Sequence, residues 1–180
     1  MIHTHRYDNG LVLLAEPMDW LESAAFTILV PSGCIHEPVE RSGLSGFTCE
    51  MALRGAGPRD SRQFINDLDC IGLERSESVG EAHTRFGGAT IADNLSDALG
   101  IYADLLRRPH FPADQLEAGR QVMFQDLRAV EDEPAQKVML RLRQCHYPDP
   151  WGRPSQGNTE AIEATLLDEI QEYFQQTYHP

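Results

Sequence analysis

The feature that most constrains the fold is the division of this 180-residue chain into a strand-forming first half and a helix-forming second half. Short apolar runs that are typical of strands occur at residues 11–15 and 24–30, and residues 73–78 and 82–91 resemble two further strands around a turn at Gly80. After residue 94 the apolar residues recur at helical spacing instead. This order predicts an α+β fold, in which one antiparallel or mixed sheet has helices packed on one face.

Capping and stop residues delimit the helices. Ser61 and Gly72 bound one of them, Pro109 ends another, and Asn158 or Thr159 begins the last. The chain has no internal repeat and is long enough to bury about 70% of its unfolded surface, so we expect a single domain over residues 1–180. The predicted helices cover residues 43–54, 61–72, 95–107, 113–131, 135–147 and 158–178.

The charge balance argues against several classes of partner. Fifteen Lys and Arg face 28 Asp and Glu, which gives a net charge of −13. Nucleic acids and anionic membranes both attract clustered Lys and Arg, so neither is an expected partner. The four cysteines show no C-x-x-C spacing and are expected to be free thiols. Because no apolar leader or membrane span is visible, the expected location is cytoplasmic, with a periplasmic one left open.

One carboxylate stands out on the predicted helix 113–131. Asp126 lies four residues after Val122 and four before Val130, so its side chain points partly into an apolar stripe. An isolated buried charge is costly, which means that Asp126 needs a partner. The simpler interpretation is that Asp126 forms an ion pair or a helix-cap contact. The functional interpretation is that it is a metal ligand.

The stretch GLSGFTCEM, residues 43–51, is the other candidate. Leu44, Phe47, Thr48 and Met51 form its apolar face. Cys49 is interpreted as a small buried side chain and Glu50 as a solvated one, unless the two belong to a site. Nucleophile-elbow, phosphate-loop and dinucleotide motifs are all missing, so these residues alone do not give a function.

Four strings together resemble the N-terminal half-unit of the M16 (insulinase/pitrilysin-like) metallopeptidases, a family that also includes mitochondrial processing peptidases. Their order and spacing carry the resemblance, which covers almost the whole chain. The strings are DNGLVLLAEP, SGCIHEPVERSGLSGF, YADLLRRPHFPADQLEAGRQVMFQDL and DPWGRPSQGNTEAIEATLLDEIQEYFQQTYHP.

Active members of that family carry H-x-x-E-H, in which two His bind zinc and the Glu is the general base. The two His positions match Gly46 and Glu50, and the base position matches Cys49. The third ligand, a Glu on a later helix, matches Asp126, which lies 76 residues after Glu50. The resemblance therefore implies a degenerate motif with no zinc expected. Cys49, Glu50 and Asp126 remain weak candidates for another metal such as Mg²⁺ or Ca²⁺.

The resemblance also implies a peptide site and a partner. Family members add their substrate as a β-strand to a sheet edge, which here matches residues 73–78, with Arg75 and Ser76 in place of the usual Asn-Ala pair. The family assembles from such half-units, and this chain is expected to lack the strand that follows its last helix. The expected partner is an active M16 subunit or a second copy of the chain.

Three functional hypotheses follow. The leading one is a non-catalytic structural or peptide-holding partner of an active M16 peptidase. The second is an active metallopeptidase with an altered metal site. The third is a peptide-binding module that has no protease partner.

Overall fold

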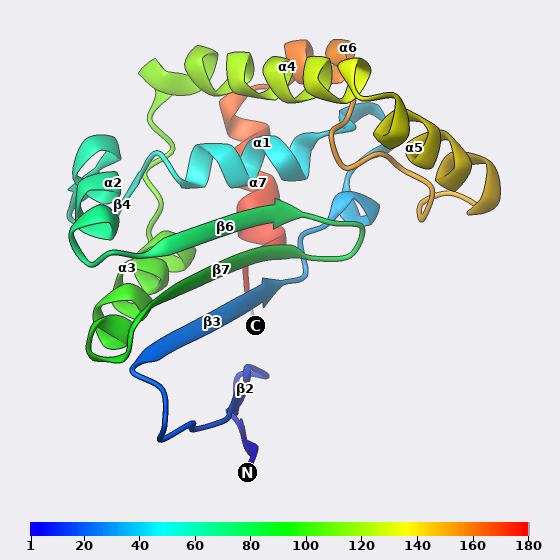
Figure 1. Cartoon of the computed structure of the whole chain (residues 1–180). Helices are drawn as coiled ribbons and strands as arrows, with labels where there is room; N and C mark the ends of the chain where they lie inside the picture. The colour runs from blue at the N-terminus through cyan, green and yellow to red at the C-terminus, as the bar shows by residue number, and fades with distance from the viewer. Residues whose placement is uncertain (180) are drawn as a thin grey trace.

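The computed structural model describes residues 1–179 and has the expected α+β architecture (Figure 1). A three-stranded antiparallel sheet has the order β3-β7-β6, and helices pack against it. The strands are β1 (His3–Arg6), β2 (Val12–Ala15), β3 (Ser23–Val30), β4 (Gly55–Ala56), β5 (Arg59–Asp60), β6 (Glu74–Val79) and β7 (Thr84–Ile91). The helices are α1 (Leu44–Ala52), α2 (Ser61–Cys70), α3 (Leu95–Arg107), α4 (Leu116–Asp132), α5 (Pro134–His146), α6 (Thr159–Ala164) and α7 (Leu167–Thr177).

One face of the sheet is covered and the other is open. Residues alternate between exposed and more buried along β3, as expected for a strand with one face in water. On the covered face, the Phe86 ring lies edge-on to Tyr102 of α3 and to Tyr178, which follows α7, with ring centroids 6.2 Å apart in both pairs. The prediction of one sheet with helices on one face is therefore confirmed.

The N-terminal hairpin lies apart from this sheet. Strands β1 and β2 pair only with each other, and all of their residues are exposed. The strand predicted at residues 11–15 is thus present, and His3 and His5 lie on its partner strand. The two short strands β4 and β5 were not predicted, because Gly55–Asp60 reads as turn sequence.

Helix α1 occupies the centre of the molecule. Most of its residues are buried, and it contacts α4, α7 and β6. The buried Glu37 carboxylate holds its N-terminus, because it accepts hydrogen bonds from the backbone N–H groups of Gly43 (2.9 Å) and Ser45 (2.8 Å). The Ser45 hydroxyl donates to the same carboxylate. A carboxylate at this position satisfies free N–H groups and complements the helix dipole.

The last predicted helix, residues 158–178, is wrong as a single element. The chain leaves the helix at Thr165 and Leu166, whose backbones are extended, and then begins α7. The cause is Arg120 of α4, which is 9% exposed and donates to the carbonyl oxygens of Ile162, Glu163 and Thr165. This long-range contact could not be read from local helical periodicity.

The other predicted helices are confirmed with small shifts at their ends. Residues 113–115 form a 3₁₀ turn before α4, and residues 31–43 contain two further 3₁₀ turns. Within residues 1–179, no helix has both the length and the apolar character that a membrane crossing requires. Cys34 and Cys49 are buried free thiols, whereas Cys70 and Cys145 are exposed ones.

Candidate functional site

The four positions singled out in the sequence lie together at one cleft, which we call the α1–α4 cleft. It has a volume of about 420 Å³. In Figure 1, α4 runs along one side of α1 and the end of β6 lies on the other. Its walls include Gly46, Cys49 and Glu50 of α1, Met123 and Asp126 of α4, Glu77, Ser78 and Val79 of β6, and the loop residues Ser155 and Gln156.

Gly46 leaves a gap on α1 that Met123 fills. A Cβ atom added to Gly46 would lie 2.9 Å from the Met123 methyl carbon and 3.6 Å from the Ser155 carbonyl oxygen. Met123 is 4% exposed and belongs to the hydrophobic core. A flexible thioether therefore occupies the space into which a longer side chain at position 46 would extend. Met123 lies three residues before Asp126 on the helix predicted over residues 113–131, and its place in the cleft was not predicted.

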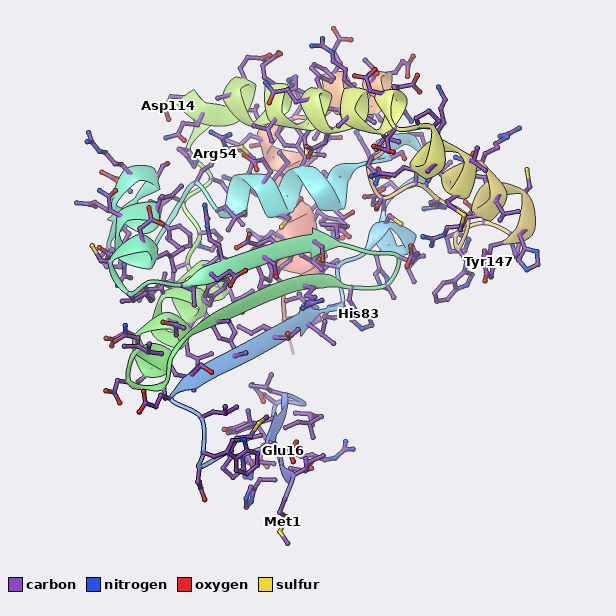
Figure 2. All side chains as sticks on the ribbon, in the orientation of Figure 1. Met1, Glu16, Arg54, His83, Asp114 and Tyr147 are labelled. Atoms are coloured by element: carbon purple, nitrogen blue, oxygen red, sulfur yellow. The ribbon has the colours of Figure 1, made fainter. Side chains whose placement is uncertain are left out.

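Glu50 is held by an arginine of its own helix end. Its carboxylate accepts hydrogen bonds from Arg54 Nη2 (2.6 Å) and Nε (3.1 Å), and Figure 2 shows Arg54 at the end of α1. Burial raises the pKa of Glu50, and the Arg54 hydrogen bonds oppose that shift only in part. The solvated Glu50 that was the default expectation is therefore a partly buried member of an ion pair.

Cys49 faces the cleft but is nearly closed off from water, with 5% of its surface exposed. Burial raises its thiol pKa far above the ordinary value of 9.0, and the nearby carboxylates of Glu77 and Glu50 raise it further. The thiolate is the reactive form of cysteine, so Cys49 is a protonated, inert thiol at neutral pH. This agrees with the expectation of a small buried side chain.

Asp126 lies at the mouth of the cleft and is exposed, rather than pointing into the apolar stripe as expected. It forms no ion pair with any other residue from 1 to 179, so the ion-pair interpretation is wrong. Desolvation at the cleft raises its pKa. The α4 turn that carries it places Met123, one turn earlier, against the core.

Glu77 is a cleft residue that was not predicted from the sequence. It pairs in register with Phe86 of β7, so it lies on the covered face of the sheet, where the Tyr102 hydroxyl donates to it at 2.9 Å. Burial raises the pKa of Tyr102, and the Glu77 charge adds to this. The signal for Glu77 that the sequence did offer was an acidic residue within the strand predicted at residues 73–78.

Strand β6 is an edge of the sheet, because it pairs only with β7. Arg75 and Ser76 are both exposed, as a peptide edge would require. They lie on opposite faces, since Arg75 pairs with Gly88 and thus shares the covered face with Phe26. Arg75 lines a second cavity of about 520 Å³ beside Glu50 and Glu77. This cavity and the α1–α4 cleft share Glu50, Leu53 and Glu77 as lining residues, so the two adjoin beside β6.

Across residues 1–179, no group of three or more His, Cys, Asp or Glu side chains is arranged to share a metal ion. The cleft offers the carboxylates of Glu50, Glu77 and Asp126, which are already engaged or set apart as described above. Its chemical character is that of a polar, acidic hollow beside a strand edge.

The geometry and the comparison with known proteins agree. The model of the insulinase peptidases, family M16, matches residues 16–154. The chain belongs to family M16. It is 24% identical over 95% of its length to an uncharacterized zinc protease of Rickettsia felis, and it covers 42% of that protein. It is 22% identical over 94% of its length to a probable mitochondrial-processing peptidase subunit beta of Arabidopsis thaliana, of which it covers 32%.

Solved structures show the same fold. A peptidase M16 inactive domain from Pseudomonas fluorescens superposes with a TM-score of 0.85 at 18% identity, over 97% of this chain and 43% of that one. The M16 chain thus spans less than half of the relatives it matches. The family and the α+β half-unit fold, both expected from the sequence, are confirmed.

Proposed function

We propose that this M16 chain is a non-catalytic domain that holds an extended peptide along β6 and acts beside an active M16 subunit. One observation carries the proposal: Met123 occupies the space beside Gly46, on the face of α1 where a first metal ligand would project. The frame around that face is kept, including the buried cap at Glu37.

The residues of the α1–α4 cleft do not fit zinc. Zinc sites in proteins use imidazole, thiolate and carboxylate donors in a tetrahedral set. Gly46 offers no donor, Cys49 stays protonated, and Glu50 is committed to Arg54. Asp126 is the one free carboxylate of the four positions. No step of hydrolysis is therefore assigned to this site.

Peptide holding rests on the edge strand. Main-chain hydrogen bonds supply affinity when an extended peptide joins a sheet edge, and they require no particular side chain. β6 offers such an edge beside two adjoining cavities, so the change to Arg75 and Ser76 does not remove the capacity. The similarity to a processing-peptidase subunit supports an M16 peptidase as the partner.

Three measurements test the proposal. Elemental analysis after dialysis against zinc should find no stoichiometric metal, and a quenched-peptide assay should detect no cleavage. Stoichiometric zinc together with cleavage would favour the alternative, an active metallopeptidase with an altered site. Fluorescence anisotropy should detect binding of an unstructured peptide, and N-methylation of alternate backbone amides in that peptide should abolish it. Equal binding of both peptides would contradict strand addition.

A further inference from the structure

A second hollow begins where β6 ends. It lies between the turn Gly80–His83 and the stretch from Met139 to Trp151, and we call it the distal groove. Its volume is about 950 Å³, within the range of sites that bind small molecules and peptide side chains. Figure 2 places His83 and Tyr147 at this end of the molecule, beyond the tip of β6.

The walls of the distal groove are anchored. The carbonyl oxygens of Gly80 and Glu81 accept hydrogen bonds from the backbone of Cys34 (3.1 Å) and Ile35 (3.0 Å). Gly33 allows this approach, because a Cβ there would lie 2.2 Å from the Glu81 carbonyl oxygen. Across the groove, Arg143 of α5 forms an ion pair with Glu81. A groove with fixed walls needs little ordering on binding.

Large apolar side chains line this groove without being covered. Met139, Leu142, Tyr147 and Trp151 are each at least 50% exposed. Such clusters of exposed apolar side chains mark interaction sites when they gather in one hollow. Trp and Tyr are also the residues that contribute most to recognition.

The distal groove continues the hollow along β6. Val79 lines the α1–α4 cleft and its neighbour Gly80 lines the groove, so one wall passes directly from one to the other. The opposite wall does the same, because Trp151 and Ser155 belong to one short loop. A peptide paired with β6 and extended past Val79 would therefore enter the distal groove.

Charge narrows the choice of ligand. Residues 134–148 carry Lys137, Arg141 and Arg143 and no Asp or Glu, although the chain as a whole has a net charge of −13. Lys137 is paired with Glu131 and Arg143 with Glu81, so Arg141, next to Leu142, is the cation of the three that forms no ion pair within residues 1–179. An anionic membrane would meet the repulsion of that acidic surface, whereas a short segment can contact α5 alone. The complementary ligand is an apolar side chain next to a carboxylate.

We propose that the distal groove is a specificity site, which binds a large apolar side chain of the peptide held by β6 and favours an acidic neighbour. This inference rests on the proposed function, because the peptide must reach the groove along β6.

Anisotropy with a set of labelled peptides tests it. The host is an alternating Ser-Thr peptide of about twelve residues, enough to span β6 and the groove in extended form. A single Phe is moved along it, with an Ala set as the reference. We expect one Phe position to bind at least about tenfold tighter than its Ala counterpart, the order that burial of one aromatic side chain supplies. A Glu beside that Phe should bind tighter than a Lys.

Two matched variants locate the effect. Leu142→Asp places a charge in the groove, while Val138→Asp places one on the same helix outside it, at a residue that is also more than half exposed. The Phe preference should vanish in Leu142→Asp and persist in Val138→Asp. Equal binding of all Phe positions, or an unchanged preference in Leu142→Asp, would overturn the specificity site while strand addition stands. No binding by any peptide would overturn both proposals.

Discussion

The N-terminus of helix α1 and its cleft face differ in the contacts that their groups make. At its N-terminus, the Glu37 carboxylate, the Ser45 hydroxyl and two backbone N–H groups form a closed, buried set of hydrogen bonds. On the cleft face, Gly46 contributes no side chain and Cys49 is inert. The cap at the N-terminus therefore uses none of the side chains at the motif positions of the cleft face. The chemistry of the cleft face is thus separate from the hydrogen bonds that cap the helix.

The first way to break this comparison is to remove the cap. Glu37→Ala leaves the N–H groups of Gly43 and Ser45 without a partner in a buried place, which we expect to cost about 2–4 kcal/mol of unfolding free energy. Glu40→Ala, an exposed carboxylate in the same loop, is the control and should cost less than about 0.5 kcal/mol. Chemical denaturation measures both, and equal losses would contradict the role of Glu37.

The second way is to release the C-terminal helices. Arg120→Met removes three hydrogen bonds to the end of α6 and the contact with the Phe47 ring, where the guanidinium carbon lies 5.3 Å from the centroid. We expect the free energy of unfolding to fall by about 2–3 kcal/mol. Arg128→Met, at an exposed position of the same helix, should be near neutral. Faster amide exchange in α6 than in the wild type would locate the effect.

Restoring the ligands sharpens the comparison. A quadruple variant with Gly46→His, Cys49→Glu, Glu50→His and Asp126→Glu supplies the family's donors, but the imidazole introduced in place of Gly46 meets the Met123 methyl group. Adding Met123→Ala clears that space. We expect the quintuple variant to bind zinc at least about tenfold tighter than the quadruple one, equal to ~1.4 kcal/mol by isothermal titration. Equal zinc affinities would show that Met123 is no obstacle.

The smallest expected effect is a dependence of stability on pH. Burial raises the pKa values of Glu37, Glu50 and Asp126, so the folded state holds their protons more tightly than the unfolded chain does. The stabilisation that these three protonated groups provide is complete below the ordinary carboxyl pKa. It is lost as pH rises through the pKa values that the groups have in the folded state. The unfolding free energy should therefore rise by up to ~1 kcal/mol from pH 7 to pH 5.

Carboxylates with lowered pKa values change the unfolding free energy in the opposite direction, but only below the interval from pH 7 to pH 5. Their stabilising contribution is lost as pH falls through and below their ordinary pKa values, 3.8 for Asp and 4.5 for Glu. Glu50→Gln should make the rise between pH 7 and pH 5 smaller. A fall in stability over the same interval would contradict the assignment. The carboxylates whose pKa values are lowered in the folded state are Asp104, Glu117, Asp149 and Glu169.

The sequence allowed the fold to be predicted wherever the signal was local. The apolar spacing at 61–72 and 95–107 predicted α2 and α3, and the turn at Gly80 predicted the β6–β7 hairpin. The break between α6 and α7 was missed because its cause, Arg120, lies 42 residues before Ile162. Spacing relative to the family motif placed Gly46, Cys49, Glu50 and Asp126 at one cleft.

What local patterns could not provide was the environment of each site residue. The environment of Glu50 depends on where the Arg54 side chain lies. The environment of Glu77 depends on the strand register that brings it to Tyr102. Asp126 was expected inside an apolar stripe, yet it is an exposed side chain on the wall of the cleft. These features depend on packing between elements far apart in the sequence.

Met123 also bears on how easily position 46 accepts a longer side chain. The nearest obstacle to a side chain at residue 46 is the terminal methyl of an unbranched chain, while the nearest backbone atom, the Ser155 carbonyl oxygen, is 3.6 Å away. A rotamer change can move a methyl group, whereas a backbone obstacle would require refolding of a loop. A longer side chain at position 46 is thus opposed by a movable side chain, so few substitutions separate this domain from one that carries a ligand there.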